Sequence, residues 1–347
     1  MSTRPLLMTL DCCAGFPVSP WWKEDAPSGA RRFSPKMDAE PRTDASAGLA
    51  AGTRCGYVVL AGLPNAGKST LLNALVGEHL SIVTSRAQTT WQRVAGIRTE
   101  GAVQMVFLDT PGIVASRELF HRSMMAEAEC ARRDADAAVG VVDGTGRPSP
   151  AQLEALMGFL DRCRCPAAVA VNKADHPRFD PRRIGLLERR PDLPAFVVSA
   201  LARTGLEPLL EFLDSRLPEG PFLYPEDDLA AAPTRFFVQE LVRETVFENY
   251  RQEIPYSVAV RVEEFRESED PIYIAAALYV ERKSQKGILI GRGGVGIRAL
   301  GVGARARIEH LLGRRVYLDL WVRVSDGWKR KKEGLMKFGY GVPDDDD

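Results

Sequence analysis

A glycine-rich segment at residues 62–69 reads GLPNAGKS and places a lysine directly before a serine. In a phosphate loop, glycines let backbone N–H groups converge on phosphate oxygens, the lysine reaches the outer phosphates and the hydroxyl binds Mg²⁺. Such a loop needs a strand before it and a helix after it, and the patterns at 57–61 and 70–76 predict both. The expected phosphate-binding residues are Gly62, Asn65, Ala66, Gly67, Lys68, Ser69 and Thr70.

Two further motifs contribute to the phosphate side of the expected site. The sequence DTPG at 109–112 offers a carboxylate for a Mg²⁺-bound water and a glycine N–H for a γ-phosphate. The loop Gln88-Thr89-Thr90 carries hydroxyls that can close over Mg²⁺, and we favour Thr90 over Thr89. The predicted site residues are Ser69, Thr90 and Asp109 for Mg²⁺, Asn65, Lys68, Thr90 and Gly112 for catalysis, with Thr110 and Pro111 lining the nucleotide.

Recognition of a base is predicted by two later motifs, NKAD at 172–175 and SAL at 199–201. The carboxylate of Asp175 can accept hydrogen bonds from N1–H and the exocyclic amine of guanine, a donor pair that adenine lacks. A backbone N–H of the second motif can reach the guanine O6. We therefore predict that GTP is cleaved to GDP, with a base site formed by Asn172, Lys173, Asp175, Ser199, Ala200 and Leu201.

The residue after Gly112 is Ile113, where many Ras-like GTPases have the glutamine that orients the attacking water. An isoleucine cannot take that role, so hydrolysis must rely on Mg²⁺ and fixed donors, and slow turnover is expected. One hypothesis adds a K⁺ ion held by Asn65, and the alternative is that Asn65 only shapes the loop.

These motifs follow short β-branched runs that alternate with longer amphipathic stretches. Buried strands separated by helical patterns predict an α/β domain with a doubly wound, mostly parallel sheet, typical of a P-loop GTPase. We expect it to span 55–217, after a disordered extension at 1–54 and before a Pro-rich linker at 218–232. The expected strands are 57–61, 94–98, 103–108, 137–142, 167–171 and 195–198.

A second, α+β domain is expected at 233–341, with an acidic tail at 342–347. Its pattern predicts a helix at 234–250, strands near 256–262, 272–280 and 316–324, and the sequence ILIGRGG at 288–294 before an amphipathic helix. Residues 281–340 contain fifteen basic and five acidic side chains, a net charge of +10 in a chain of zero formal charge. A polyanion partner is therefore indicated.

The glycines at 291–294 match the GxxG loop of KH domains, which lets an RNA backbone approach closely beside a groove for about four nucleotides. We predict single-stranded RNA as the ligand, with contacts from Lys286, Gly287, Ile290, Gly291, Arg292, Gly293 and Gly294. Trp321 and Trp328 are interpreted as packing residues. The six cysteines and four histidines form no set with metal-ligand spacing, and no apolar run reaches the ~18 residues of a membrane span.

Taken together, these residues resemble the Era family of bacterial GTPases over about 56–341. The specific segments are SIV at 81–83 before Gln88-Thr89-Thr90, DTPG at 109–112, IPYSV at 254–258, YVER at 279–282 and SQKG at 284–287. The resemblance implies a type II KH domain, binding of the 3′ end of 16S rRNA and a role in maturation of the 30S subunit. It also implies a cytoplasmic monomer, with peripheral association with the inner face of the cell membrane as a further expectation.

The chain departs from the family pattern at two positions. Trp91 stands where the family usually has arginine and Ala66 where it usually has valine, which predicts different dynamics of the loop over Mg²⁺. Two alternatives stand beside a GTP-controlled RNA-binding switch: a GTPase acting on another RNA such as tRNA, and an RNA chaperone with a degenerate nucleotide site. The absence of a Cys or His cluster counts against modification chemistry, and the complete set of nucleotide motifs counts against degeneracy.

Overall fold

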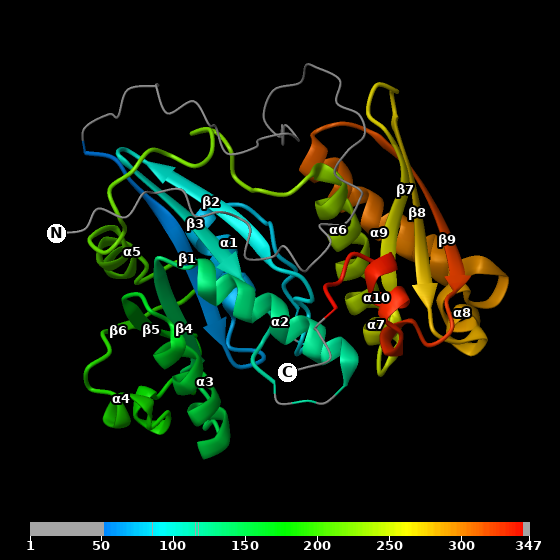
Figure 1. The fold of residues 1–347 in the computed structure, drawn as a ribbon. Coiled ribbons are helices and arrows are strands. Elements are labelled where there is room, and N and C mark those ends of the chain that lie inside the picture. The colour runs from blue at the N-terminus through cyan, green and yellow to red at the C-terminus, as the bar shows by residue number, and fades with distance from the viewer. Residues whose placement is uncertain (1–51, 85, 115, 117, 343–347) are drawn as a thin grey trace.

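The computed structural model of the chain describes residues 52–84, 86–114, 116 and 118–342. Most of the expected extension and acidic tail therefore lies outside the described residues. The ribbon divides into a larger unit around a six-stranded sheet and a smaller unit around a three-stranded sheet (Figure 1). Among the described residues, no helix has the length and apolar character needed to cross a membrane.

The sheet of the larger unit has the strand order β2-β3-β1-β4-β5-β6. All neighbouring pairs are parallel except β2 and β3, so the predicted doubly wound, mostly parallel architecture is confirmed. The strands are β1 (Arg54–Gly62), β2 (Val94–Glu100), β3 (Val103–Asp109), β4 (Ala137–Asp143), β5 (Ala167–Asn172) and β6 (Ala195–Val197).

Helices cover both faces of this sheet, which explains why its strands are continuous apolar runs. Along β1, Val58 and Leu60 belong to one core cluster, whereas Val59 and Ala61 belong to the other. Helices α1 (Lys68–Val76) and α5 (Glu207–Asp214) pack on the first face, and α2 (Leu119–Asp134) and α3 (Pro150–Arg162) on the second. Two short helices, η3 (Pro181–Arg183) and α4 (Leu186–Arg189), lie between β5 and β6.

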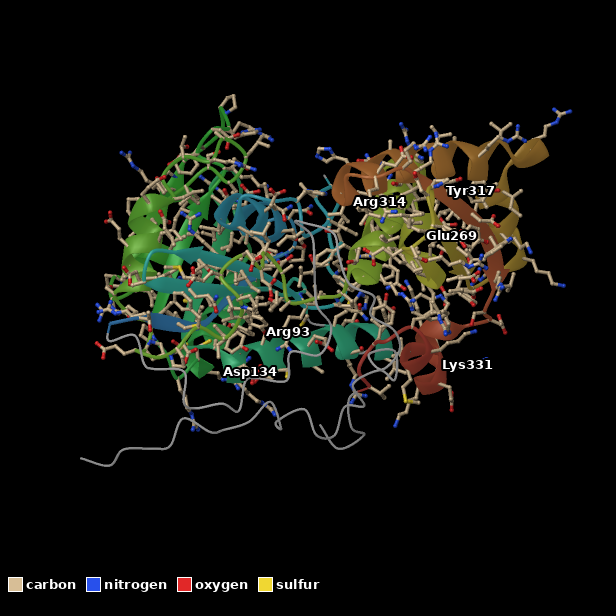
Figure 2. All side chains as sticks on the ribbon, turned by 90° about the horizontal axis from the view of Figure 1, so that it is seen from above. Arg93, Asp134, Glu269, Arg314, Tyr317 and Lys331 are labelled. Atoms are coloured by element: carbon tan, nitrogen blue, oxygen red, sulfur yellow. The ribbon has the colours of Figure 1, made fainter. Side chains whose placement is uncertain are left out.

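The smaller unit has the sheet order β7-β8-β9, with β8 and β9 parallel. Buried residues of α6 and α9 form one cluster with the strands. The elements are α6 (Thr234–Asn249), α7 (Ile254–Ser257), β7 (Ala259–Arg266), β8 (Ile272–Val280), α8 (Lys283–Ile290), η4 (Arg292–Gly294), α9 (Val295–Leu312), β9 (Val316–Val324), η5 (Trp328–Arg330) and α10 (Lys332–Lys337). Near the start of β9, Arg314 donates to the backbone carbonyls of Glu267 and Glu269, both at 3.0 Å, which fastens the β7–β8 connection (Figure 2).

Three details of the smaller unit differ from the sequence expectation. The strand expected from residue 256 begins at Ala259, because Pro255 occupies the first turn of helix α7. Residues 283–290 form helix α8, so Ile288 to Ile290 are helical and only 291–294 form the glycine turn. Helix α10 was not anticipated, since six residues are too few to show a helical period.

The two units are joined by the segment at 218–232 and by a shared core. This segment lies against the edge strand β2, where the N–H of Ile97 donates to the carbonyl of Leu229 at 2.8 Å. The shared core, which we call the aromatic interface, combines residues of the loop before β2 and of α2 with residues of the smaller unit. Its buried members are Trp91, Phe120, Met124, Phe247, Ala259, Ala277, Tyr279, Trp328, Leu335 and Tyr340.

Trp91, one of the two departures from the family pattern, belongs to the aromatic interface. Trp91 is 2% exposed and lies edge-on to Phe120, with 5.1 Å between the ring centroids. The guanidinium of Arg243 lies 4.4 Å from the centroid of the Trp91 ring. Trp328 is buried in the same core, as interpreted from the sequence, whereas Trp321 is 39% exposed on β9.

Candidate nucleotide site and RNA-binding loop

The phosphate loop connects β1 to α1 in a tight turn that depends on glycine. Gly67 has a φ of 90°, and a Cβ at that position would lie 2.3 Å from Nδ2 of Asn172. A Cβ at Gly62 would lie 2.4 Å from the carbonyl oxygen of Val141. Asn65 also has a positive φ, 62°, which asparagine tolerates better than most residues. The loop is therefore packed against β4 and β5 and is held in one shape.

Lys68, at the start of α1, folds back across this loop. Its side chain is buried, and Nζ donates to the carbonyls of Gly62 and Leu63, both at 3.3 Å. Burial lowers the pKa of the Lys68 ammonium, and the nearby Asp109 carboxylate opposes that shift. A buried ammonium with carbonyl partners favours an anionic ligand, and a phosphate would supply the missing negative charge.

The three predicted magnesium ligands lie within hydrogen-bonding distance of one another. Oδ2 of Asp109 accepts from Oγ of Ser69 at 2.7 Å and from Oγ1 of Thr90 at 3.2 Å. These two hydroxyls are 2.9 Å apart. Thr90, the residue favoured over Thr89, thus contacts the carboxylate at the end of β3.

Asp109 itself has the features of a metal-site carboxylate. It is fully buried, and burial raises the pKa of its carboxyl, a shift that Lys68 and the hydroxyl donors oppose. Its Oδ1 is buried without a hydrogen-bond partner among the described residues. Carboxylate and hydroxyl oxygens are the hard ligands that Mg²⁺ prefers, so the residues present fit this ion.

The remainder of the DTPG motif continues from β3 toward the phosphate loop. Oγ1 of Thr110 donates to the carbonyl of Leu60 at 2.8 Å, which ties the motif to β1. Gly112 follows Pro111 and packs against Pro64, where a Cβ would approach within 3.2 Å. The N–H of Ile113 donates to the carbonyl of Gly62 at 3.0 Å, and its side chain packs against the core.

The base-recognition motifs meet at Asn172, the last residue of β5. Its Oδ1 accepts from the N–H of Lys173 at 2.8 Å and of Ala200 at 3.0 Å, while Nδ2 donates to the carbonyl of Ala66 at 3.0 Å. One side chain therefore connects both base motifs to the phosphate loop. The carboxylate of Asp175 accepts a short hydrogen bond from Oγ of Ser199.

The outer edge of the base site includes a residue that the motif analysis missed. Nζ of Lys173 forms an ion pair with Oδ2 of Asp143 at 2.6 Å. Burial would raise the pKa of Asp143, but hydrogen bonds from Lys173 and Thr145 outweigh it and lower that pKa. Asp143 is the last residue of β4. Its position directly after an apolar run is the sequence feature that could have identified it. Leu201, the last residue of the second base motif, is 77% exposed.

The predicted RNA-contacting residues lie together from the middle of α8 to the start of α9. Gly291, Gly293 and Gly294 all have positive φ values, of 70°, 62° and 79°. A Cβ at Gly291 would lie 2.9 Å from the N–H nitrogen of Gly296, whereas a Cβ at Gly293 would meet nothing within 4 Å. Gly293 thus offers open backbone, and Arg292 beside it is exposed. Lys286, Gly287 and Ile290 precede the turn on α8.

The fold and these two sites define a P-loop guanine-nucleotide-binding protein that also carries a KH domain. Residues 57–173 match the family described as 50S ribosome-binding GTPase, and residues 253–329 match the KH domain family. The sequence is 42% identical to GTPase Era of Nitratidesulfovibrio vulgaris strain DP4, covering 82% of this chain and 96% of that protein. It is 38% identical to GTPase Era of Pseudomonas aeruginosa PAO1, covering 86% and 99%.

Solved structures agree with these sequence matches. A variant of Aquifex aeolicus Era bound to GDP·AlF4⁻ is 34% identical, with a TM-score of 0.79, and covers 84% of this chain and 100% of that one. A structure of Era with MgGDPNP and nucleotides 1506–1542 of 16S ribosomal RNA has the same identity, TM-score and coverage of both chains. The chain belongs to the GTPase Era family, as the sequence motifs predicted, and it is a GTPase.

Proposed function

We propose that this GTPase binds 16S rRNA near its 3′ end and assists maturation of the 30S ribosomal subunit, with bound nucleotide controlling RNA binding. The observation that carries this proposal is the position of the segment around Thr90 between the two domains. Trp91 lies in the aromatic interface, and Nε2 of Gln92 donates to the carbonyl of Gly339 at 2.7 Å. Tyr256 donates from its hydroxyl to the carbonyl of Ala87 at 3.2 Å.

The bound nucleotide would control RNA binding through the position of Thr90. Thr90 would leave Asp109 and turn toward Mg²⁺ when a γ-phosphate is present, and its neighbour Trp91 would carry that change to the KH domain. Bound Mg²⁺ supplies positive charge to the phosphates. Ser69, Thr90 and Asp109 would hold it, and their mutual hydrogen bonds support this assignment. The Era structure with MgGDPNP supports Mg²⁺ as the ion.

The remaining nucleotide contacts are assigned to the motif residues. Lys68 binds the outer phosphates, Gly112 presents its N–H to the γ-phosphate, and Asp175 selects guanine. Because the Ile113 side chain has no polar atom, we keep the proposal that Asn65 holds a K⁺ ion that compensates charge during hydrolysis. Equal GTP turnover in potassium and sodium would contradict the K⁺ proposal and leave Asn65 as a loop-shaping residue.

Binding of rRNA is supported by the open backbone at Gly293, the exposed Arg292 and the net charge of +10 over 281–340. The Era structure with nucleotides 1506–1542 of 16S rRNA supports the same ligand here. We place the protein in the cytoplasm, where its proposed partner is assembled.

The test compares the parent with Arg292→Asp combined with Gly293→Asp. Two carboxylates would face the RNA phosphates, and a side chain at the positive φ of Gly293 would strain the turn, so RNA binding should be lost. Basal GTP hydrolysis should remain, because the loop is separate from the nucleotide site. Arg305→Asp, a charge reversal in α9 outside the loop, is the control.

Three RNAs at one fixed salt concentration distinguish the alternatives: the 3′ end of 16S rRNA, a scrambled version and a tRNA. The proposal expects binding and a change in GTP turnover with the first RNA only, and neither in the double variant. Equal binding of the true and scrambled RNAs would reduce the domain to a nonspecific basic surface. Preferential response to tRNA would instead favour the alternative substrate.

A further inference from the structure

A third hydroxyl reaches the buried carboxylate of Asp109, from a residue outside the predicted site. Oγ of Ser81 donates to Oδ2 of Asp109 at 2.7 Å, and Ser81 is 2% exposed. The other two donors to this oxygen are Ser69 and Thr90, the assigned magnesium ligands. On binding the ion, their hydroxyl groups would give up their hydrogen bonds to Asp109. Ser81 would then be the donor that keeps the carboxylate oriented, with Oδ1 available for a water molecule.

The position of Ser81 is determined first by the GTPase domain. Asn73, on helix α1, is buried, and both ends of its side-chain amide contact the segment that contains Ser81. Its Oδ1 accepts from the N–H groups of Leu80 and Ser81, both at 2.9 Å, and its Nδ2 donates to the carbonyl of Ser81 at 2.8 Å. The helix that begins at the phosphate loop therefore fixes the backbone of Ser81.

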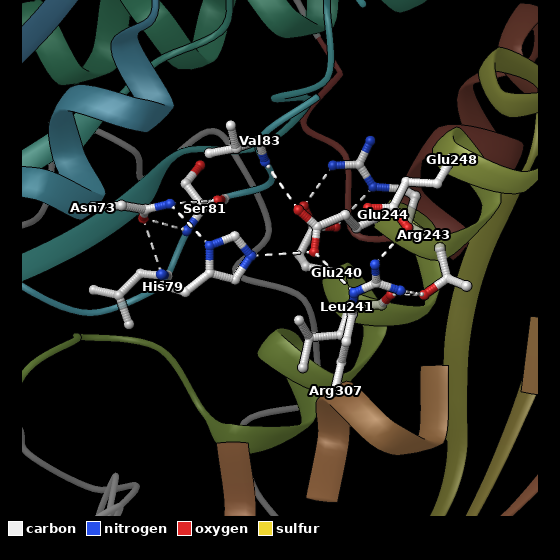
Figure 3. Close-up of polar contacts among 12 residues, drawn as sticks. Asn73, His79, Ser81, Val83, Glu240, Leu241, Arg243, Glu244, Glu248 and Arg307 are labelled. Carbon is white, nitrogen blue, oxygen red and sulfur yellow. Dashed lines mark hydrogen bonds and ion pairs between the residues drawn. The ribbon is translucent and has the colours of Figure 1, made fainter. Parts of the chain in front are cut away.

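The KH domain holds the same segment from the opposite side (Figure 3). Glu244, on α6, is 3% exposed. Its Oε1 accepts from the N–H of Val83 at 3.1 Å, and its Oε2 accepts from Nε2 of His79 at 3.1 Å. One carboxylate thus binds the chain two residues before and two residues after Ser81. Arg307 of α9 lies 3.9 Å from the same Oε2 and supplies positive charge.

We propose that Ser81 is a positioning residue for the magnesium site and that Glu244 links this position to the docked KH domain. Two hydrogen-bonded steps connect the domains, from Asp109 to Ser81 and from the backbone around Ser81 to Glu244. Displacement of α6 would release His79 and Val83, loosen Ser81 and weaken the hold on Asp109. The proposal rests on the assignment of Asp109 to Mg²⁺, which belongs to the proposed function.

The test measures release of a fluorescent GDP analogue from the full chain as a function of MgCl₂ concentration, with EDTA as the magnesium-free limit. Ser81→Ala should raise the magnesium concentration for half-maximal retention by about 10- to 100-fold, the usual effect of losing a residue that orients a metal ligand. Release in EDTA should match the parent, because Ser81 acts through the metal site. Ser81→Thr keeps the hydroxyl and should retain the GDP analogue at lower magnesium concentrations than Ser81→Ala does.

Glu244→Gln tests the link to the KH domain. The amide keeps the size of the side chain but removes the charge that faces His79 and Arg307, so a smaller shift in the same direction is expected. Glu248→Gln is the matched control, since Glu248 lies on the same helix and also pairs with Arg307 but forms no hydrogen bond or ion pair with the described residues at 79–83. An effect of Glu244→Gln no larger than that of the control would overturn the link.

Faster release in EDTA by Ser81→Ala would overturn the positioning role and indicate a general structural one. Asp109→Asn separates the inference from the assignment beneath it. If Asp109→Asn shifts the magnesium dependence and Ser81→Ala does not, the assignment stands and the inference fails. If neither variant shifts it, the proposed magnesium site itself is wrong.

Discussion

Replacing Trp91 by alanine tests whether the aromatic interface stabilises the two-domain arrangement. Trp91 is the central ring of this interface, with Phe120, Trp328 and Tyr340 at centroid distances of 5.1, 6.4 and 6.1 Å. It is also the surface on which Arg243 stacks. The truncation would leave a cavity bordered by both domains.

The size of the expected stability loss follows from the burial of the Trp91 side chain. Removing a buried tryptophan side chain costs about 3–5 kcal/mol in the free energy of unfolding, from lost transfer energy and the remaining cavity. Loss of the cation–π contact with the buried Arg243 adds about 1–2 kcal/mol. The expected total is therefore at least about 4 kcal/mol, and the melting temperature should fall by roughly 2–4 °C for each kcal/mol.

The assay is urea unfolding followed by circular dichroism, because removing a tryptophan changes the fluorescence signal itself. Trp91→Phe keeps most of the ring contacts and should lose less stability than alanine. Trp321→Ala removes a tryptophan that is 39% exposed and serves as the control. A loss for Trp91→Ala no greater than for Trp321→Ala would refute the role given to the interface.

Three further changes have defined outcomes. Asp175→Asn should weaken GTP binding and favour xanthosine triphosphate, whose 2-oxo group accepts from the new amide; unchanged GTP affinity would remove Asp175 from the base site. Gly67→Ala should abolish nucleotide binding, measured by equilibrium titration, because the new Cβ would lie 2.3 Å from Asn172. Burial lowers the pKa of Lys329 to about 8. Between pH 8 and 10 the Lys329 side chain therefore binds more protons in the unfolded chain than in the folded one, so its contribution to the free energy of unfolding should rise with pH. Lys329→Met should remove that part of the rise in melting temperature, and identical pH profiles for parent and variant would contradict it.

The meeting of the predicted nucleotide motifs was foreseeable from the sequence because each motif is local. The residues of 62–70, 109–112, 172–175 and 199–201 follow strands whose apolar runs mark their ends, and parallel strands bring those ends to one edge of the sheet. The six strands of the larger domain were each located within a few residues for the same reason. Helix α8 was missed because its short, mixed sequence merges with the glycine turn.

The sequence by itself determined the fold class, the guanine-nucleotide motifs, the KH loop and the family, since these depend on the identity and spacing of neighbouring residues. Only the tertiary structure decided how the domains meet. The contacts of Glu244 with His79 and Val83 join residues more than 160 positions apart. No periodicity or motif predicts such a pairing, because it depends on the orientation in which two folded domains pack. Trp91 was therefore only an unusual residue in the sequence, and packing placed it at the centre of the aromatic interface.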